Sequence, residues 1–262
     1  MAKINLDKYY TPVELAKSCI EKTFEIIGRE NITDIIEPSA GNGSFSLQMD
    51  CTAYDIAPEH ESIIKQDFLK LELPYKKGRL IIGNPPYGKG NYTAVHFYKK
   101  AYSLGDYISF ILPISQLNNN MYMYQFDMIK SIDLNLQLYS GRKVHCCLNV
   151  YSRPKIINKK PVFKLNDVKL KGVGLGESRN DKVPQKYDFS ISAFGASIGK
   201  ICEKENQYCQ QTYFTINPKF KDLVLAKIKN ADWCTLFGMT ATPRVKHWQI
   251  IKYLKEQIPE LS

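Results

Sequence analysis

Residues 34–43 read Asp-Ile-Ile-Glu-Pro-Ser-Ala-Gly-Asn-Gly, a short apolar run that ends in a carboxylate and a glycine-rich turn. An apolar run of this length bounded by Pro and Gly predicts a short buried strand. Similar apolar runs recur further along the chain. The segments between the first few of these runs have apolar residues at helical spacing. Strands that alternate with helices favour a mostly parallel sheet with helices on its faces.

The predicted elements follow from these runs. The first is a helix in which Thr11 caps, Pro12 takes the first helical position and Glu14 completes a capping box. Strands are expected at 34–37, 51–55, 79–83, 107–112, 134–139 and 144–151, a weakly helical stretch near 63–64, and a helix that includes 95–102. Only residues 140–143 separate the last two strands, so these should form an antiparallel closing hairpin.

The net charge of the sequence and the frequency of Pro and Gly residues that interrupt regular structure change near residue 155. Residues 155–262 hold 19 Lys and Arg against 10 Asp and Glu, a net charge of +9, which leaves +1 for residues 1–154. Prolines and a Gly-Val-Gly-Leu-Gly segment at 172–176 divide this later part into short pieces. We therefore expect an α/β domain over 1–154 and a basic region over 155–262 that binds a polyanion.

Composition excludes several classes. The chain has 262 residues and 44% hydrophobic content, which suits a globular protein with a sizeable core. Its longest apolar run is far shorter than the about 20 residues of a membrane span, and we expect no signal peptide and a cytoplasmic location. The seven cysteines and four histidines have no zinc-type spacing, so no metal is expected.

The glycine turn and the next strand ends predict a nucleotide-like cofactor site. Glycines at 41 and 43 let the backbone approach a ligand, and Glu37 can accept hydrogen bonds or offset an ammonium or sulfonium charge. Asp55, at the end of the next strand, is placed to bind both ribose hydroxyls. Asp67 and Phe68 would then offer an acceptor and an aromatic face to an adenine ring.

The stretch Asn84-Pro85-Pro86-Tyr87 follows the strand at 79–83 and predicts the catalytic chemistry. The Asn84 side-chain oxygen and the Pro85 carbonyl are two acceptors, and both prolines fix φ and remove competing donors. Two acceptors on the hydrogens of an exocyclic amine would make its nitrogen more tetrahedral and direct the lone pair at a methyl group. Tyr87 offers a ring on which a base could stack, and catalysis would be positioning and electrostatics.

These residues resemble the motifs of gamma-type, Asn-Pro-Pro-Tyr DNA adenine-N6 methyltransferases, over about residues 8–153. Tyr10-Thr11-Pro12 looks like the first motif of that family, residues 37–45 like its glycine motif and residues 84–87 like its catalytic motif. The resemblance implies a site-specific DNA methyltransferase with a seven-stranded Rossmann-like fold, a closing antiparallel hairpin and a small basic C-terminal domain. It also implies S-adenosylmethionine as cofactor and a bacterial or phage-encoded, restriction-modification type of enzyme.

The resemblance assigns the site residues as follows. Catalytic residues would be Asn84, Pro85, Pro86 and Tyr87, and cofactor contacts would be Tyr10, Thr11, Pro12, Glu37, Pro38, Ser39, Gly41, Gly43, Asp55, Ile56, Asp67, Phe68 and Asn84. The target adenine must leave a DNA duplex to reach such a pocket. About a hundred residues is short for a recognition region, which implies a short site, a second copy or a partner subunit.

Other functions remain open at this point. The Asn-Pro-Pro-Tyr motif also resembles that of ribosomal RNA guanine-N2 methyltransferases, and a basic region grips RNA as well as DNA. It resembles glutamine-amide methyltransferases of release factors too, but those carry an N-terminal domain and end soon after the sheet. A DNA-binding accessory protein without turnover is disfavoured by the presence of both Asn84 and Glu37.

Overall fold

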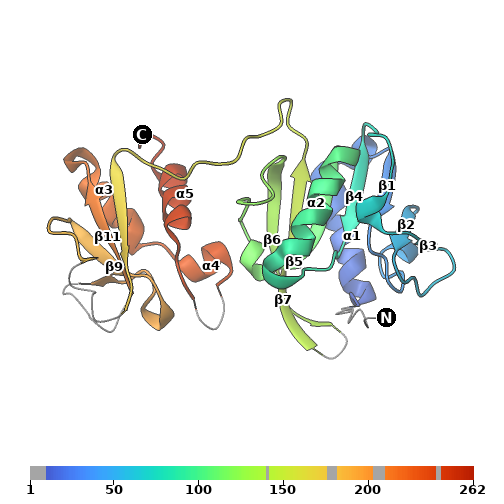
Figure 1. Cartoon of the computed structure of the whole chain (residues 1–262), viewed down its shortest axis with the longest axis horizontal. Helices are drawn as coiled ribbons and strands as arrows, with labels where there is room; N and C mark the ends of the chain where they lie inside the picture. The colour runs from blue at the N-terminus through green and yellow to red at the C-terminus, as the bar shows by residue number, and fades with distance from the viewer. Residues whose placement is uncertain (1–9, 140–141, 176–181, 203–209, 240–242) are drawn as a thin grey trace. The chain divides into compact units, whose positions relative to one another are not determined.

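A computed structural model describes residues 10–139, 142–175, 182–202, 210–239 and 243–262. The chain divides into two compact units, unit 1 over residues 1–161 and unit 2 over residues 162–262 (Figure 1). The break lies a few residues beyond the predicted boundary at 154 and 155. The division of roles between the two parts stays a prediction.

Unit 1 is built on a seven-stranded sheet with the order β3-β2-β1-β4-β5-β7-β6. Its strands are β1 Asp34–Glu37, β2 Thr52–Asp55, β3 Ile64–Lys65, β4 Arg79–Gly83, β5 Tyr107–Pro113, β6 Asp127–Tyr139 and β7 Arg142–Ser152. Neighbouring strands pair in parallel from β3 through β5, and β7 runs antiparallel to both β5 and β6. The predicted mostly parallel sheet with a closing antiparallel hairpin is confirmed.

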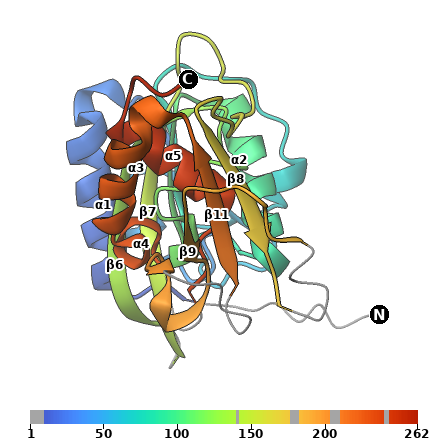
Figure 2. The ribbon, with the colours of Figure 1, turned by 90° about the vertical axis from the view of Figure 1, so that its left-hand side faces the viewer.

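One helix covers each face of this sheet. Figure 2 shows α1 (Val13–Ile27) and α2 (Tyr92–Leu104) on opposite sides of the strands. Alternate strand residues point to opposite faces. Leu80 and Ile82 of β4 therefore pack in the cluster that contains the buried face of α1, whereas Ile81 between them packs in the cluster that contains α2. Glycine 28, with φ of +82°, ends α1.

Two local predictions are wrong. Pro12 is the N-cap of α1, and no side-chain hydrogen bond caps this helix, because the Thr11 hydroxyl faces Asn84 instead. The stretch near 63–64 is not helical: Ile64 and Lys65 form β3, which pairs in parallel with Tyr54 and Asp55 of β2. A helix this short is unfavourable because its first turn fixes several residues for few hydrogen bonds. The segment makes backbone hydrogen bonds to β2 instead.

Unit 2 has a four-stranded antiparallel sheet with the order β10-β9-β11-β8. The strands are β8 Val168–Val173, β9 Phe189–Ser192, β10 Ile201–Cys202 and β11 Gln211–Ile216, and the helices are α3 Lys221–Lys229, α4 Trp233–Phe237 and α5 His247–Gln257. Residues of all three helices and of the strands share one apolar core. In it Trp233 is 2% exposed and Phe214 stacks on Phe189 with ring centroids 4.5 Å apart.

None of the described helices has both the length and the apolar composition that a membrane span requires.

Candidate active site

The glycine turn lies at the carboxyl end of β1. Gly41 and Gly43 have φ of +55° and +88°, values that side chains other than glycine rarely adopt. A Cβ on Gly43 would come within 2.9 Å of the Leu47 side chain. The Tyr10 ring lies against Gly41, 3.6 Å from where its Cβ would be. The turn therefore brings backbone and the Tyr10 ring together beside the predicted cofactor residues.

Glu37 ends β1 inside the protein, with 2% of its surface exposed. The backbone N–H of Ser46 donates to its Oε2 at 2.8 Å. Burial raises the pKa of the Glu37 carboxyl to about 7; the hydrogen bonds from Ser46 lower it and the charge of Asp55 raises it further. Gly83, at the end of the neighbouring strand β4, approaches it so closely that a Cβ there would lie 3.4 Å from Glu37 Cγ. Glu37 is thus a buried acid that a bound cation would ionise.

Asp55 is the last residue of β2. Its side chain links the turn that follows β1 to the turn that follows β2. Its Oδ2 accepts from the Gly41 N–H and its Oδ1 from the Ala57 N–H, each at 2.8 Å. A carboxylate oxygen can accept more than one hydrogen bond, so both oxygens retain capacity for hydroxyl donors. Ile56, the next residue, exposes 46% of its surface beside this acid. Asp55 and Ile56 therefore fit the predicted ribose and adenine end of a cofactor.

Asp67 and Phe68 are placed differently from each other. The Asp67 side chain is 36% exposed, and its Oδ1 accepts from the Leu69 N–H at 3.0 Å. Phe68 is 1% exposed and stacks on Phe97 in the core, with ring centroids 5.5 Å apart. Asp67 can therefore offer an acceptor, whereas the Phe68 ring has no open face for adenine, and we do not retain it as a stacking residue.

Asn84 follows β4 at the carboxyl edge of the sheet. Its side-chain Nδ2 donates to the Thr11 Oγ1 at 3.1 Å, and the Ser39 hydroxyl donates to its backbone oxygen at 3.3 Å. The contact with Thr11 orients the side-chain amide so that its other end, Oδ1, is the free acceptor. Among the described residues, Asn84 Oδ1 is buried and has no hydrogen-bond partner. An unsatisfied buried acceptor costs about 1–3 kcal/mol, so a ligand donor at this atom would be favourable.

The rest of the catalytic motif lies between core and surface. Pro85 is buried and Pro86 is exposed. Tyr87 is half-buried, with its hydroxyl 3.5 Å from the Cys146 sulfur of β7, and burial raises its pKa well above the usual value. Its stacking role stays a prediction, since the hydroxyl end of the ring is directed toward the core.

Together these contacts bring residues from three parts of the chain to one edge of the sheet. Thr11 and Ser39 both bind Asn84, and Gly41 binds Asp55. Glu59 is a further residue at this edge that the sequence does not indicate: its side chain accepts from the Tyr10 hydroxyl, and its N–H donates to the Gly41 carbonyl at 2.9 Å. No local pattern pointed to it, because both contacts span many residues. No group of three His, Cys, Asp or Glu suited to a metal occurs in the described part of the chain.

Replacing Thr11 with valine tests whether the Asn84 amide is oriented by its neighbour. The variant keeps the shape of the side chain but removes the acceptor for Asn84 Nδ2. We expect kcat to fall about tenfold with little change in KM, because loss of one hydrogen bond of this kind is worth about 1–2 kcal/mol. Thr11→Ser, which retains the hydroxyl, should behave like the parent. Equal loss in both variants in steady-state assays would refute this role.

Comparisons with known proteins add a resemblance in fold. No protein-family model matches the sequence, and no curated protein sequence does either. A type I restriction-modification methyltransferase subunit from Streptococcus thermophilus has a similar structure, with a TM-score of 0.43 and 12% identity. That alignment covers 84% of this chain and 53% of the other, so this chain spans about half of that subunit.

Two further structures resemble this one over a smaller share of the chain. The 23S rRNA methyltransferase ErmE has a TM-score of 0.41 and 16% identity, with 57% of this chain and 71% of ErmE aligned. Magnesium protoporphyrin IX methyltransferase from Synechocystis PCC 6803, solved with bound S-adenosylmethionine, has a TM-score of 0.37 and 12% identity, covering 58% and 88% of the two chains. Scores this low carry no information on activity, so the chemistry must be judged from the site itself.

Proposed function

We propose that this protein is an S-adenosylmethionine-dependent methyltransferase that methylates the exocyclic N6 amine of adenine in DNA. The single observation that carries this proposal is the buried, unpartnered Oδ1 of Asn84 at the carboxyl edge of the sheet. Open α/β sheets bind their ligands at this edge. The proposal therefore assigns a donor to an acceptor that the described protein leaves unsatisfied.

An exocyclic amine is the donor that suits this acceptor. Its nitrogen is a poor nucleophile because the lone pair is delocalised into the ring. A hydrogen bond from the amine to Asn84 Oδ1 would hold one N–H in place and favour a tetrahedral nitrogen whose lone pair points at the methyl donor. Thr11 fixes the amide, so little reorganisation is needed when the amine arrives.

The neighbouring residues fit the cofactor. When bound, S-adenosylmethionine supplies an electrophilic methyl group on a positively charged sulfur. Asp55, beside the glycine turn, would accept the ribose hydroxyls, and Ile56 would cover the adenine. Glu37 would ionise near the positive charges of the cofactor, and the Tyr10 ring would close over Gly41 at the amino-acid end.

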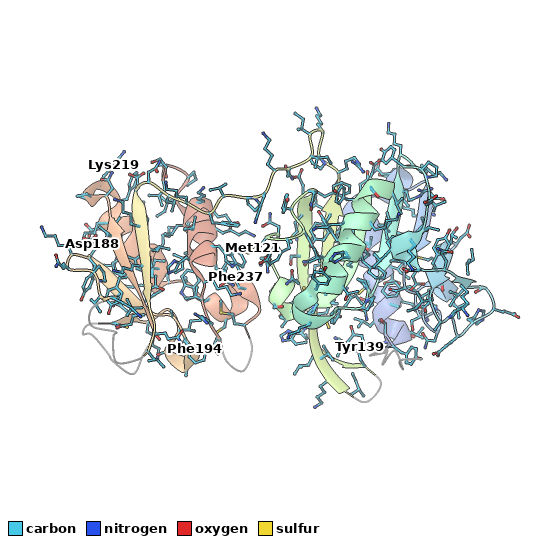
Figure 3. All side chains as sticks on the ribbon, viewed as in Figure 1. Met121, Tyr139, Asp188, Phe194, Lys219 and Phe237 are labelled. Atoms are coloured by element: carbon cyan, nitrogen blue, oxygen red, sulfur yellow. The ribbon has the colours of Figure 1, made fainter. Side chains whose placement is uncertain are left out.

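A nucleic acid is the proposed polymer because unit 2 holds 16 Lys and Arg against 10 Asp and Glu over residues 162–262, and its surface also offers an aromatic ring. DNA is the kind of nucleic acid that the resemblance of residues 8–153 implies. Phe194 is 42% exposed (Figure 3) and forms an isolated β-bridge with Arg244. Val245 is buried, and Arg244 and Lys246 on either side of it are exposed. A ring for stacking beside two cations is suited to a nucleic-acid backbone and its bases.

Charge reversal at this surface should weaken DNA binding and its dependence on salt. We expect Arg244→Glu/Lys246→Glu to lower the slope of log affinity against log salt by about 2 in magnitude, since each lost phosphate contact removes about one released counterion. Fluorescence anisotropy at several salt concentrations measures this. Lys77→Glu/Lys99→Glu makes the same charge change at exposed positions of unit 1. An equal effect of both pairs would mean that net charge alone, and no defined surface, governs binding.

The identity of the substrate polymer can be tested by measuring which polymer receives a labelled methyl group. Purified protein is incubated with S-adenosylmethionine labelled in its methyl group, together with unmethylated genomic DNA, ribosomal RNA and a protein extract. We expect label in DNA. Label confined to RNA would keep the methyltransferase site and discard DNA as substrate, and label in protein would point to a glutamine amide.

A further inference from the structure

Tyr10 and Thr11, the residues just before the N-cap of α1, contact two different parts of the carboxyl edge of the sheet. Thr11 is 6% exposed, and its hydroxyl accepts from the Asn84 amide after β4. The Tyr10 hydroxyl donates to the Glu59 carboxylate, in the loop that follows β2. Because β1 lies between β4 and β2 in the sheet, this segment crosses the end of β1, where the glycine turn begins.

The Tyr10 ring is the part of the segment that lies against the glycine turn. Its Cε1 and Cδ1 lie 3.6 and 3.8 Å from the position that a Cβ on Gly41 would take. The Gly41 N–H donates to Asp55, and the Gly41 carbonyl accepts from the Glu59 N–H. Glu59 therefore contacts Gly41 through its backbone and the ring beside Gly41 through its side chain.

The loop that carries Glu59 is held in place by its own contacts. Ile63, at the far end of this loop, is 5% exposed and packs with Ala40 and Ala53. Pro58 fixes the backbone immediately before Glu59. The Glu59 carboxylate thus has a defined position from which it can orient another side chain.

A tyrosine ring held in this way is ready for a ligand. Its two side-chain torsions would otherwise have to be immobilised when a ligand binds, which reduces affinity. A hydrogen bond to an ionised acceptor is stronger than one between neutral groups, although exposure to water weakens it. The hydrogen bond between Tyr10 and Glu59 should therefore make a modest and measurable contribution to binding at the glycine turn.

We propose that Glu59 is a positioning residue for the cofactor, and that it acts by holding the Tyr10 ring over S-adenosylmethionine bound at the glycine turn. The inference rests on the proposed function and adds a residue that lies outside the sequence motifs. The Thr11 contact that orients Asn84 does not involve Glu59. Loss of Glu59 should therefore weaken cofactor binding and spare the transfer step.

Titration calorimetry with S-adenosylmethionine tests the first part of this inference. Tyr10→Phe keeps the ring and loses the donor, and Glu59→Ala loses the acceptor. Each should weaken the Kd about fivefold, and the double variant should be no weaker than either, because both changes remove one shared hydrogen bond. Glu59→Gln keeps an acceptor oxygen and should stay within about twofold of the parent protein. The matched control Glu61→Ala removes an exposed carboxylate from the same loop and should leave the Kd unchanged.

Methyl-transfer kinetics separate positioning of the cofactor from general damage to the site. In Glu59→Ala the KM for the cofactor should rise about fivefold, whereas kcat at saturating cofactor should stay within about twofold of the parent value. If Glu59→Ala lowers the melting temperature, Tyr10→Phe carries the same test, because it changes a single hydroxyl group.

The other outcomes would overturn the inference in distinct ways. Additive losses in the double variant, or equal losses in Glu59→Gln and Glu59→Ala, would mean that the charge of Glu59 contacts the cofactor directly. A fall in kcat as large as the rise in KM would indicate general damage, and an equal effect of Glu61→Ala would indicate net charge alone. Absence of S-adenosylmethionine binding by the parent protein would instead reject the proposed function itself.

Discussion

Replacing Asn84 with alanine should reduce the rate of methyl transfer by about 100-fold or more while changing the Kd of S-adenosylmethionine by less than about threefold. The variant removes the buried Oδ1, the only atom of this side chain without a partner in the described structure, together with the Nδ2 that binds Thr11. Single-turnover assays measure the transfer step, and calorimetry measures cofactor binding.

A second variant separates the acceptor from the general shape of the side chain. Asn84→Asp keeps an acceptor oxygen at the same place and loses the donor to Thr11. We expect its single-turnover rate to lie between those of the parent and Asn84→Ala. Near-normal transfer by Asn84→Ala would contradict the role given to Oδ1. An equal and complete loss in both variants would show that the orientation of the amide matters more than the acceptor.

Glu37→Gln should have opposite effects on stability and on cofactor binding. Glu37 is buried, with a pKa raised from 4.5 to about 7, so the folded protein disfavours its charged form. A raised carboxyl pKa leaves stability intact below about 4.5 and reduces it as pH rises to about 7. Above that pH the loss is about 3 kcal/mol, an upper limit for the gain from removing the charge.

Denaturant unfolding and calorimetry measure these two effects. Without cofactor at pH 8, Glu37→Gln should be at least as stable as the parent, and at pH 4 the difference should vanish. At pH 7.5 its Kd for the cofactor should be about tenfold weaker, because an ionised partner of a cation is lost. The ratio of the two Kd values should shrink at pH 6, where the parent carboxyl is largely protonated. A ratio independent of pH would exclude ionised Glu37 from cofactor binding.

Much of the fold follows from local sequence, with clear exceptions. β4 is predicted to the residue because five consecutive buried positions end in a glycine and an Asn-Pro-Pro turn. β6 starts seven residues earlier than predicted, since it is an edge strand and its first half exposes many side chains. β3 has two exposed residues and is defined by its pairing with β2, which no local pattern shows.

The candidate site was predictable in its residue types and less so in its contacts. Asn84, Glu37 and Asp55 stand at strand ends, and parallel strands bring such ends to one edge. The hydrogen bond from the Asn84 amide to the Thr11 hydroxyl joins residues that are 73 positions apart. It takes the place of the helix-capping contact that the local sequence pattern predicts for Thr11. The burial of Phe68 depends on its stacking on Phe97 of α2, which its aromatic type alone does not show, so its predicted contact with the cofactor stays a prediction.

The amine that we propose to bind at Asn84 is the N6 of adenine, and identifying the atom that receives the methyl group tests this assignment. S-adenosylmethionine with a trideuterated methyl group is incubated with unmethylated DNA and either the parent protein or Asn84→Ala. The DNA is then digested to nucleosides for mass spectrometry. We predict deuterated N6-methyldeoxyadenosine with the parent protein and about 100-fold less with the variant. Label on cytosine or guanine, or adenine label of equal amount with both proteins, would contradict this assignment.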